Sequence, residues 1–391
     1  MGNAFLSKRG GGGSAEINFK NYTPSNIAIE KTSATALSAA RGDLAATTVG
    51  NYALFGGGSS NGSTVDAYNS SLTRSTPTAL SVARDWLAAT TVGNYALFGG
   101  GTPPSEDSSA TVDAYNSSLT RSTPTALSVA MFGLAATTVG NYALFGGGNP
   151  SIGELVATVN AYTSSLVRST PTALSKARGY VVATTVGDYA LFGGGQTVGS
   201  GDATVDAYNS SLTRSTPTAL SVARNLLAAT TVGNYALFGG GRGTASVNAY
   251  NSSLVRSTPT ALSKARSYAA ATTVGVYALF GGGGPVLGDA YDTVDAYNSS
   301  LTRSTPTALS KARGNLAATT VGNYALFGGG SSNGSTVDAY SLGPAEMVVY
   351  KNSSYKFQNM SAEEKVTSAI KNISVPAPVT GYIKVKNTVI S

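Results

Sequence analysis

The sequence predicts an all-β fold built from seven copies of one repeating unit. The segment Tyr-Ala-Leu-Phe-Gly-Gly-Gly occurs seven times, each time shortly after Ala-Thr-Thr-Val-Gly and before Val-Asp/Asn-Ala-Tyr. These runs are rich in residues that favour strands, and turn residues separate them. Repeats of this length are typical of solenoids, propellers and arrays. The copies begin at Tyr52, Tyr95, Tyr142, Tyr189, Tyr235, Tyr277 and Tyr324.

Each unit is expected to contain four strands, and the second unit shows them clearly. Gly93-Asn94 is a two-residue hairpin signal between its first and second strands. The first strand is rich in Ala and Thr, whose small side chains suit a crowded centre. The fourth strand contains Pro124, which has no N–H to donate, so this strand should lie at an edge of its sheet. Four such strands describe one blade of a β-propeller. The expected strands cover residues 87–92, 95–98, 111–115 and 121–127.

All variation in the length of the unit lies in one loop. The spacing between copies ranges from 42 to 47 residues, and the loop after the glycine triplet ranges from 5 to 10 residues. Each change in spacing equals the change in this loop, so the rest of the unit has a constant length. A constant length is expected when every unit packs against identical neighbours.

The two ends of the repeat region predict how the ring of blades closes. After Tyr340 the chain leaves the pattern before it reaches a fourth strand, whereas residues 29–37 match the fourth-strand segment 72–80. We therefore expect the strand at 29–37 to complete the last blade and to close a seven-bladed propeller over residues 26–340. A ring closed in this way leaves no exposed sheet ends.

The unit resembles the kelch repeat, which forms β-propellers. The resemblance rests on the glycine pair that closes the second strand, the downstream aromatic residue, and an arginine between the fourth strand and the next first strand. A kelch unit normally has its own Trp, whereas this chain has only Trp86, and we expect Leu72 and its equivalents to fill that packing role. The glycine-rich start and the near-identical units also resemble tail-associated proteins of phages that infect gut bacteria.

The segments on either side of the propeller differ from it in composition. Residues 1–25 are predicted to form a flexible arm, and residues 341–391 a small β-rich appendage. Either segment could attach the chain to other virion proteins. The alternatives are a disordered end for the first segment and a cap on the ring for the second.

The composition excludes several classes of site. The sequence has no Cys and no His, which excludes thiolate and imidazole metal sites and His-based catalysis, so we expect no cofactor and no enzymatic activity. The net charge of +7 is spread along the units, without the basic stripe and interleaved aromatics typical of nucleic-acid binding. No apolar run is long enough to span a membrane, so membrane insertion is not expected.

The units differ from one another mainly in two places. One is the loop after the glycine triplet, and the other is a two-residue junction between the fourth strand and the next first strand. In a four-stranded meander both connections emerge on the same face, which we call the variable face. Loops on a rigid scaffold often carry recognition, and the alternative is that exposed loops simply drift. Aromatic and short polar side chains suit the binding of sugars or proteins. The junction residues expected to bind a ligand are Asp43, Asp85, Trp86, Phe132, Tyr180, Asn225, Ser267, Tyr268 and Asn315.

An arginine precedes the junction in six units, and Met131 replaces it in the third. A ring of arginines could bind an anionic glycan. Alternatively, each arginine could pair with an Asp of a blade, such as Asp66 or Asp113, and the comparable arginine of kelch units favours this structural role. The six arginines are Arg41, Arg84, Arg178, Arg224, Arg266 and Arg313.

The expected function is non-enzymatic recognition of a host-surface glycan or protein by the variable face, with the chain carried on a phage virion. The alternative is a cytoplasmic scaffold of the kelch type, which would bind a protein partner through the same face.

Overall fold

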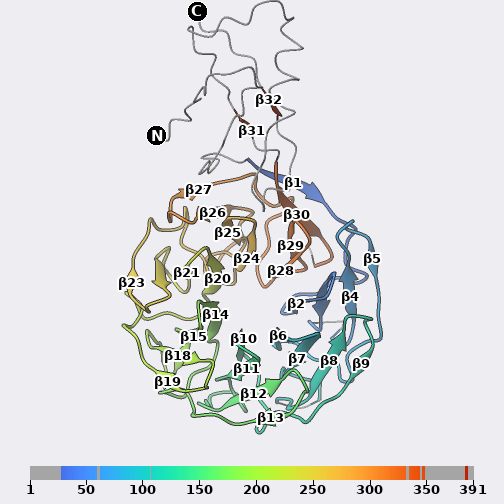
Figure 1. The fold of residues 1–391 in the computed structure, drawn as a ribbon, viewed down its shortest axis with the longest axis vertical. Coiled ribbons are helices and arrows are strands. Elements are labelled where there is room, and N and C mark those ends of the chain that lie inside the picture. The colour runs from blue at the N-terminus through green and yellow to red at the C-terminus, as the bar shows by residue number, and fades with distance from the viewer. Residues whose placement is uncertain are drawn as a thin grey trace, which may run out of the picture. The chain divides into compact units, whose positions relative to one another are not determined.

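The structure is a computed structural model that describes residues 28–59, 62–105, 107–331 and 334–343, together with the backbone of two short strands nearer the C-terminus. The described residues form strands and loops, with no helix among them. Seven four-stranded antiparallel sheets surround a central axis as the blades of a propeller (Figure 1). The expected all-β, seven-bladed fold is confirmed. Blade 1 begins with β2, and blades 2 to 7 follow in chain order.

The four strands of a blade recur with nearly constant bounds. The first strands are β2 (Ala45–Val49), β6 (Ala88–Val92), β10 (Ala135–Val139), β14 (Val182–Val186), β20 (Ala228–Val232), β24 (Ala270–Val274) and β28 (Ala317–Val321). The second strands are β3 (Tyr52–Gly56), β7 (Tyr95–Gly99), β11 (Tyr142–Gly146), β15 (Tyr189–Gly193), β21 (Tyr235–Gly239), β25 (Tyr277–Gly281) and β29 (Tyr324–Gly328). The third strands are β4 (Val65–Tyr68), β8 (Val112–Asn116), β12 (Val159–Thr163), β18 (Val205–Asn209), β22 (Val247–Asn251), β26 (Val294–Asn298) and β30 (Val337–Leu342). The fourth strands are β5 (Arg74–Ser75), β9 (Arg121–Ser122), β13 (Arg168–Ser169), β19 (Arg214–Ser215), β23 (Arg256–Ser257), β27 (Arg303–Ser304) and β1 (Ile29–Ser33).

The first strand of each blade lies nearest to the axis, where the first strands of adjacent blades are side by side (Figure 1). Threonine side chains of these strands connect the blades. Thr47 Oγ1 lies 2.9 Å from Thr91 Oγ1, which joins blades 1 and 2. Thr48 Oγ1 donates to the carbonyl oxygen of Thr320 at 2.8 Å, which joins blade 1 to blade 7. The small, hydroxyl-bearing residues at the centre therefore link the blades as well as fitting between them.

The glycine that ends each second strand makes room for an aromatic ring of the next blade. A Cβ atom at Gly56 would lie 2.7 Å from the ring of Phe98. The last blade repeats this contact with the first, because a Cβ atom at Gly328 would lie 2.7 Å from the ring of Phe55. Phe55 also packs edge-to-face against Tyr68 of its own blade, with 5.8 Å between ring centroids. These rings belong to hydrophobic clusters that are each shared by two adjacent blades.

The fourth strands are shorter than expected. In blade 2, β9 pairs with β8 only over residues 121–122, whereas the sequence predicts a strand over 121–127. Pro124 cannot donate a hydrogen bond, and backbone bonding resumes at Leu127, whose N–H donates to the carbonyl oxygen of Ala110 at 2.8 Å. The strand does lie at the edge of its sheet, as predicted.

The N-terminal strand β1 completes blade 7, where the order of strands is β1-β30-β29-β28. Beyond β1, the N–H of Ala34 donates to the carbonyl oxygen of Val337 at 3.2 Å, and that of Leu37 to the carbonyl oxygen of Ser335 at 2.7 Å. Leu37 is buried in the hydrophobic cluster that blades 1 and 7 share. This is the closure that the repeat register predicts.

The two flanking segments are largely outside the described residues. This applies to the expected arm at residues 1–25 and to most of the expected appendage at residues 341–391. Within the second segment, β31 (Glu346–Met347) pairs in parallel with β32 (Lys384–Val385). No described segment forms a helix of the length and apolarity needed to cross a membrane.

Replacing Gly56 by Ala is expected to destabilise the propeller, because the added methyl group would meet the ring of Phe98. Overpacking of this kind costs about 1–3 kcal/mol, which urea unfolding of the variant and the parent protein would measure. The double variant Gly56→Ala/Phe98→Leu should recover part of the loss, because the smaller side chain yields space. An unchanged urea midpoint in the single variant would contradict the contact.

Candidate functional site

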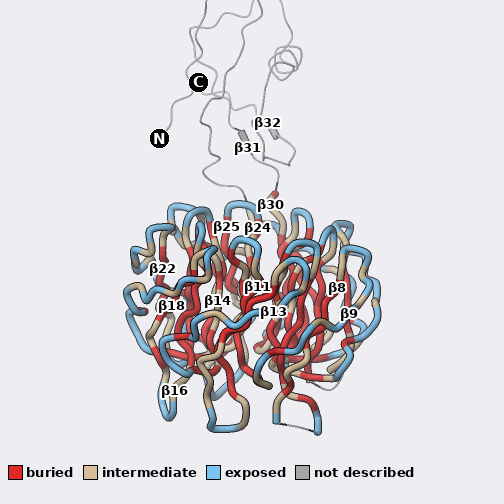
Figure 2. The backbone as a smooth tube through the Cα atoms, turned by 60° about the horizontal axis from the view of Figure 1, so that its bottom comes forward, coloured by how far each residue is buried: buried red, intermediate tan, exposed pale blue. Residues whose placement is uncertain are grey.

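The two variable parts of each unit lie side by side. Single β-bridges join the first junction residue to the residue after the glycine triplet, as between Asp85 and Thr102 and between Ser267 and Gly284. The hairpin of β16 (Gln196–Thr197) and β17 (Ser200–Gly201) lies in the same loop of blade 4 and projects beyond the blades at the bottom of Figure 2. The prediction that both variable parts share one face is confirmed.

The second junction residue of each blade belongs to a ring around one mouth of the central channel, which we call the mouth ring. All seven residues have a positive φ, from 50° to 60°. Hydrogen bonds link their backbones from blade to blade: the N–H of Trp86 donates to the carbonyl oxygen of Asp43, and that of Asp43 to Asn315, both at 3.0 Å. The mouth ring consists of Asp43, Trp86, Gly133, Tyr180, Leu226, Tyr268 and Asn315.

Three aromatic side chains of the mouth ring meet across the channel mouth. Trp86, Tyr180 and Tyr268 come from blades 2, 4 and 6. Trp86 packs edge-on against Tyr180, with ring centroids 5.6 Å apart, and lies 6.4 Å from Tyr268. The cavity that they line has a volume of about 180 Å³, and the adjacent ring residues Asn315 and Asp43 form its polar side. A ligand in this cavity would therefore meet aromatic rings together with a carboxylate and an amide.

The first junction residues are more buried than expected. Phe132, Asn225 and Ser267 are 7%, 4% and 1% exposed, which corrects the expectation that they are exposed contact residues. The loop after the glycine triplet pairs with this part of the junction and covers it. Phe132 packs against Tyr180, with 6.3 Å between ring centroids. These residues support the mouth ring, whereas Asp85 stays partly exposed beside it.

Asp43 is an unusual carboxylic acid. Burial, with a smaller effect from the nearby Asp85 carboxylate, raises the pKa of Asp43 to about 7. Burial also raises the pKa of Asp85. Asp43 Oδ1 is buried without a hydrogen-bond partner among the described residues. Near neutral pH, Asp43 is therefore divided between its charged and neutral forms.

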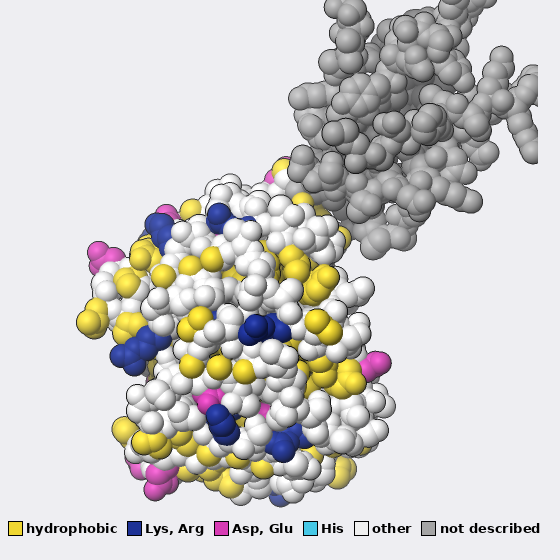
Figure 3. All heavy atoms as spheres, turned by 90° about the vertical axis from the view of Figure 1, so that its left-hand side faces the viewer, with side chains coloured by type: hydrophobic (Ala, Val, Ile, Leu, Met, Phe, Trp, Pro, Cys, Tyr) yellow, Lys and Arg dark blue, Asp and Glu magenta, His cyan; other side chains and the backbone are white. Residues whose placement is uncertain are grey.

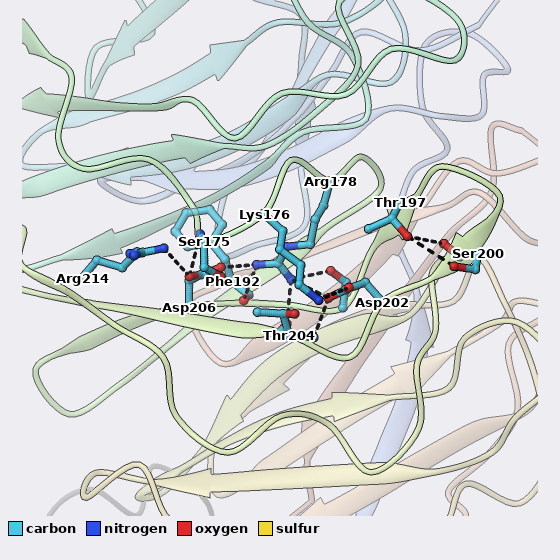
Figure 4. Close-up of polar contacts among 11 residues, drawn as sticks. Ser175, Lys176, Arg178, Phe192, Thr197, Ser200, Asp202, Thr204, Asp206 and Arg214 are labelled. Atoms are coloured by element: carbon cyan, nitrogen blue, oxygen red, sulfur yellow. Dashed lines mark hydrogen bonds and ion pairs between the residues drawn. The ribbon is translucent and has the colours of Figure 1, made fainter.

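The junction arginines are buried inside their blades and do not reach the mouth. Arg41 Nη2 donates to Asp66 Oδ2 at 2.6 Å and to the carbonyl oxygen of Phe55 at 3.2 Å. Figure 4 shows the same arrangement in blade 4, where Asp206 accepts hydrogen bonds from Arg178, Arg214 and the N–H of Ser175. Each such carboxylate, on the third strand of its blade, connects the junction arginine with a basic residue of the fourth strand. Of the two roles considered for these arginines, the structure therefore shows pairing inside the blades.

Two blades depart from this arrangement. In blade 3 the buried Met131 replaces the arginine, and Asn160 stands where five of the blades have the aspartate. In blade 5 Arg224 is retained, but its partner is the amide oxygen of Asn248, at 3.0 Å. Burial lowers the pKa of Arg224 to about 10, and its Nε and Nη1 atoms lack hydrogen-bond partners among the described residues. Blade 5 thus holds a buried cation without a carboxylate.

Three loops of the variable face expose a large apolar side chain. Ile152, Val198 and Leu287 are 90%, 85% and 90% exposed, and each precedes a glycine with positive φ. Figure 3 shows Lys and Arg scattered singly over one side of the propeller, among apolar and neutral side chains, without a continuous basic stripe.

Sequence reasoning missed the ring members Gly133 and Leu226, as well as these exposed apolar side chains. The signal for the ring was available, because every second junction residue occupies the same register position. Within the described residues, no three acidic, His or Cys side chains gather closely enough to hold a metal ion.

The variant Arg84→Met is expected to destabilise the protein by up to about 3–5 kcal/mol, because the buried Asp113 then keeps only the partly exposed Arg121 as a cationic partner. Arg224→Met should cost less than about 1 kcal/mol or stabilise, because Asn248 is neutral and blade 3 already accommodates Met131. Denaturant unfolding of both variants makes the comparison. Equal losses would show that the carboxylate does not decide the cost.

No protein-family model and no curated protein matches the sequence. Among solved structures, one titled "Structure of YjhT" superimposes with a TM-score of 0.59 at 11% sequence identity. The match covers 70% of this chain and 99% of that chain. At this identity the similarity is one of fold alone.

Proposed function

We propose that the chain is a non-enzymatic recognition module whose variable face binds a host-surface glycan or protein, and that it is carried on a phage virion. The observation that carries the proposal is the mouth ring. Its backbone repeats seven times, whereas its side chains differ from blade to blade. A constant frame with different side chains around one cavity is the arrangement expected of a binding site on a rigid scaffold.

The surroundings of the mouth ring also support a macromolecular ligand. The exposed side chains of Ile152, Val198 and Leu287 stand on loops of the same face. Apolar side chains on projecting loops would add contact area with another surface, and the aromatic residues of the ring supply contact area at low entropic cost. On this proposal the cavity takes one group of the ligand and the loops contact what surrounds it.

The placement on a virion rests on the resemblance to phage tail-associated proteins. The alternative is a cytoplasmic scaffold that binds a protein partner through the same face. Mass spectrometry of purified phage particles and of the infected-cell cytosol separates the two, and we expect the protein in the particles. Recovery from the cytosol alone, in complex with one soluble partner, would favour the scaffold.

The aromatic residues of the mouth ring are expected to dominate binding. Single variants Trp86→Gly, Tyr180→Gly and Tyr268→Gly should each weaken binding to host cells by roughly 30-fold, the effect of losing a typical hot spot of about 2 kcal/mol. Glycine is the suitable replacement, because the ring has positive φ at each position and blade 3 already uses Gly133. Binding is measured with the labelled full chain on host cells.

Val276→Gly is the control, because it removes an exposed apolar side chain from the hairpin between β24 and β25, on the face opposite the mouth ring. It should leave binding within about threefold of the parent protein, as expected outside a hot spot. If the aromatic variants bind like the control, the differences among the blades are drift.

A further inference from the structure

The two acidic side chains at the channel mouth form no ion pair within the described part of the chain. Neither Asp43 nor Asp85 forms an ion pair with a described Lys or Arg, whereas five of the six junction arginines pair with aspartates inside the blades. Elsewhere on the variable face, Lys176 pairs with Asp202 at 3.2 Å. Two carboxylates beside one partly desolvated cavity therefore favour a ligand of positive charge.

The aromatic residues around the cavity favour the same kind of ligand. Trp and Tyr rings attract cations to their faces, because the ring quadrupole is negative there. Besides burial, the Asp43 carboxylate contributes to raising the pKa values of Tyr180 and Tyr268, which come from blades 4 and 6. Trp86, the two tyrosines and Asp43 thus line one cavity. Aromatic rings recognise organic ammonium groups, and a carboxylate beside them adds Coulomb attraction for the cation.

An anionic ligand would meet few cationic side chains at the mouth. The guanidinium groups that precede the junction are almost completely buried. Arg242 is a cation whose charge reaches the ring, and it acts on Tyr268. A carboxylate or sulfate in the cavity would face Asp43 and Asp85 instead.

We propose that the mouth ring binds an ammonium group, so that the ligand of the variable face carries an amine or a methylated ammonium, as an amino sugar does. This proposal rests on the proposed function, because it names the ligand chemistry of the same site. On this proposal, the recognised host surface carries glycans with amine groups and not acidic glycans.

The single Trp of the chain makes the test direct, because Trp86 lies in the cavity and its fluorescence reports on occupancy. The full chain is titrated with glucosamine, glucose and glucuronate, and with tetramethylammonium and its neutral counterpart tert-butanol. We expect saturable changes for the two cations, with dissociation constants on the order of millimolar for ligands so small. The neutral probes should bind at least about tenfold more weakly, and glucuronate should not bind.

Binding of tetramethylammonium should strengthen as the pH rises from about 5 to about 8. The charged form of Asp43, which attracts the cation, becomes populated as the pH passes through its pKa of about 7. The titratable groups that face Asp43 are Asp85, Tyr180 and Tyr268, and the tyrosines stay neutral over this range because burial raises their pKa values.

The variant Asp43→Asn should weaken cation binding at least about tenfold and remove this pH dependence. Its matched control is Asp188→Asn, an exposed residue of the hairpin between β14 and β15, where most other blades have Asn. The control removes the same charge on the opposite face and should bind like the parent protein.

Equal binding of glucose and glucosamine, tighter binding of glucuronate, or no binding of either cation would overturn the ammonium proposal. A response to Ca²⁺ that excludes tetramethylammonium would do the same, because it would make the carboxylates a metal site. These outcomes leave the proposed function open to the host-cell assay. Conversely, if the cations bind at Trp86 while the aromatic variants still bind host cells, the ammonium site stands and the proposed function fails.

Discussion

Each blade of this propeller depends on the insertion of a phenylalanine ring over a glycine of the preceding blade. The contact repeats around the ring and closes between Gly328 and Phe55, so one blade-to-blade geometry must serve seven times. A different residue at the glycine or a larger ring would alter the angle at one interface, and the seven blades would no longer close. This constraint explains why the second strand and the glycine after it are identical in every unit, because both sides of the contact come from the same short segment.

The same constraint confines variation to positions that do not touch the interface. The mouth ring is such a place, since its backbone is fixed by hydrogen bonds from blade to blade while its side chains face a cavity. Its residues have positive φ, a conformation that costs a non-glycine residue about 1 kcal/mol or more. Blade 3 shows that glycine fits there, yet six blades keep a side chain. The strained tryptophan and tyrosines are therefore best explained by what their side chains contact.

Sequence reasoning could predict the features that follow from repeat register, namely the number of blades, the closing strand and the face on which the variable parts meet. It could not predict features that depend on how one blade covers another. Phe132 was expected to be an exposed ligand-binding residue, because nothing in its local sequence shows that the following loop folds over it. The fourth strand looked long, because its pattern is extended, whereas pairing depends on N–H groups that Pro124 lacks.

The net charge of the chain and the local charge at the channel mouth differ in sign, and the burial of the arginines explains the difference. The chain has a net charge of +7, and an arginine stands beside nearly every junction, so composition alone leaves an anionic ligand open. However, the residue opposite the junction position matches the residue at the junction. It is aspartate where the junction has a buried arginine, and asparagine where Met131 replaces the arginine. Blade 5 is the exception, because its arginine faces an asparagine. These cations neutralise the interior and contribute little at the mouth. There the unpaired Asp43 and its aromatic neighbours determine the potential, which is why a basic protein presents a site suited to a cation.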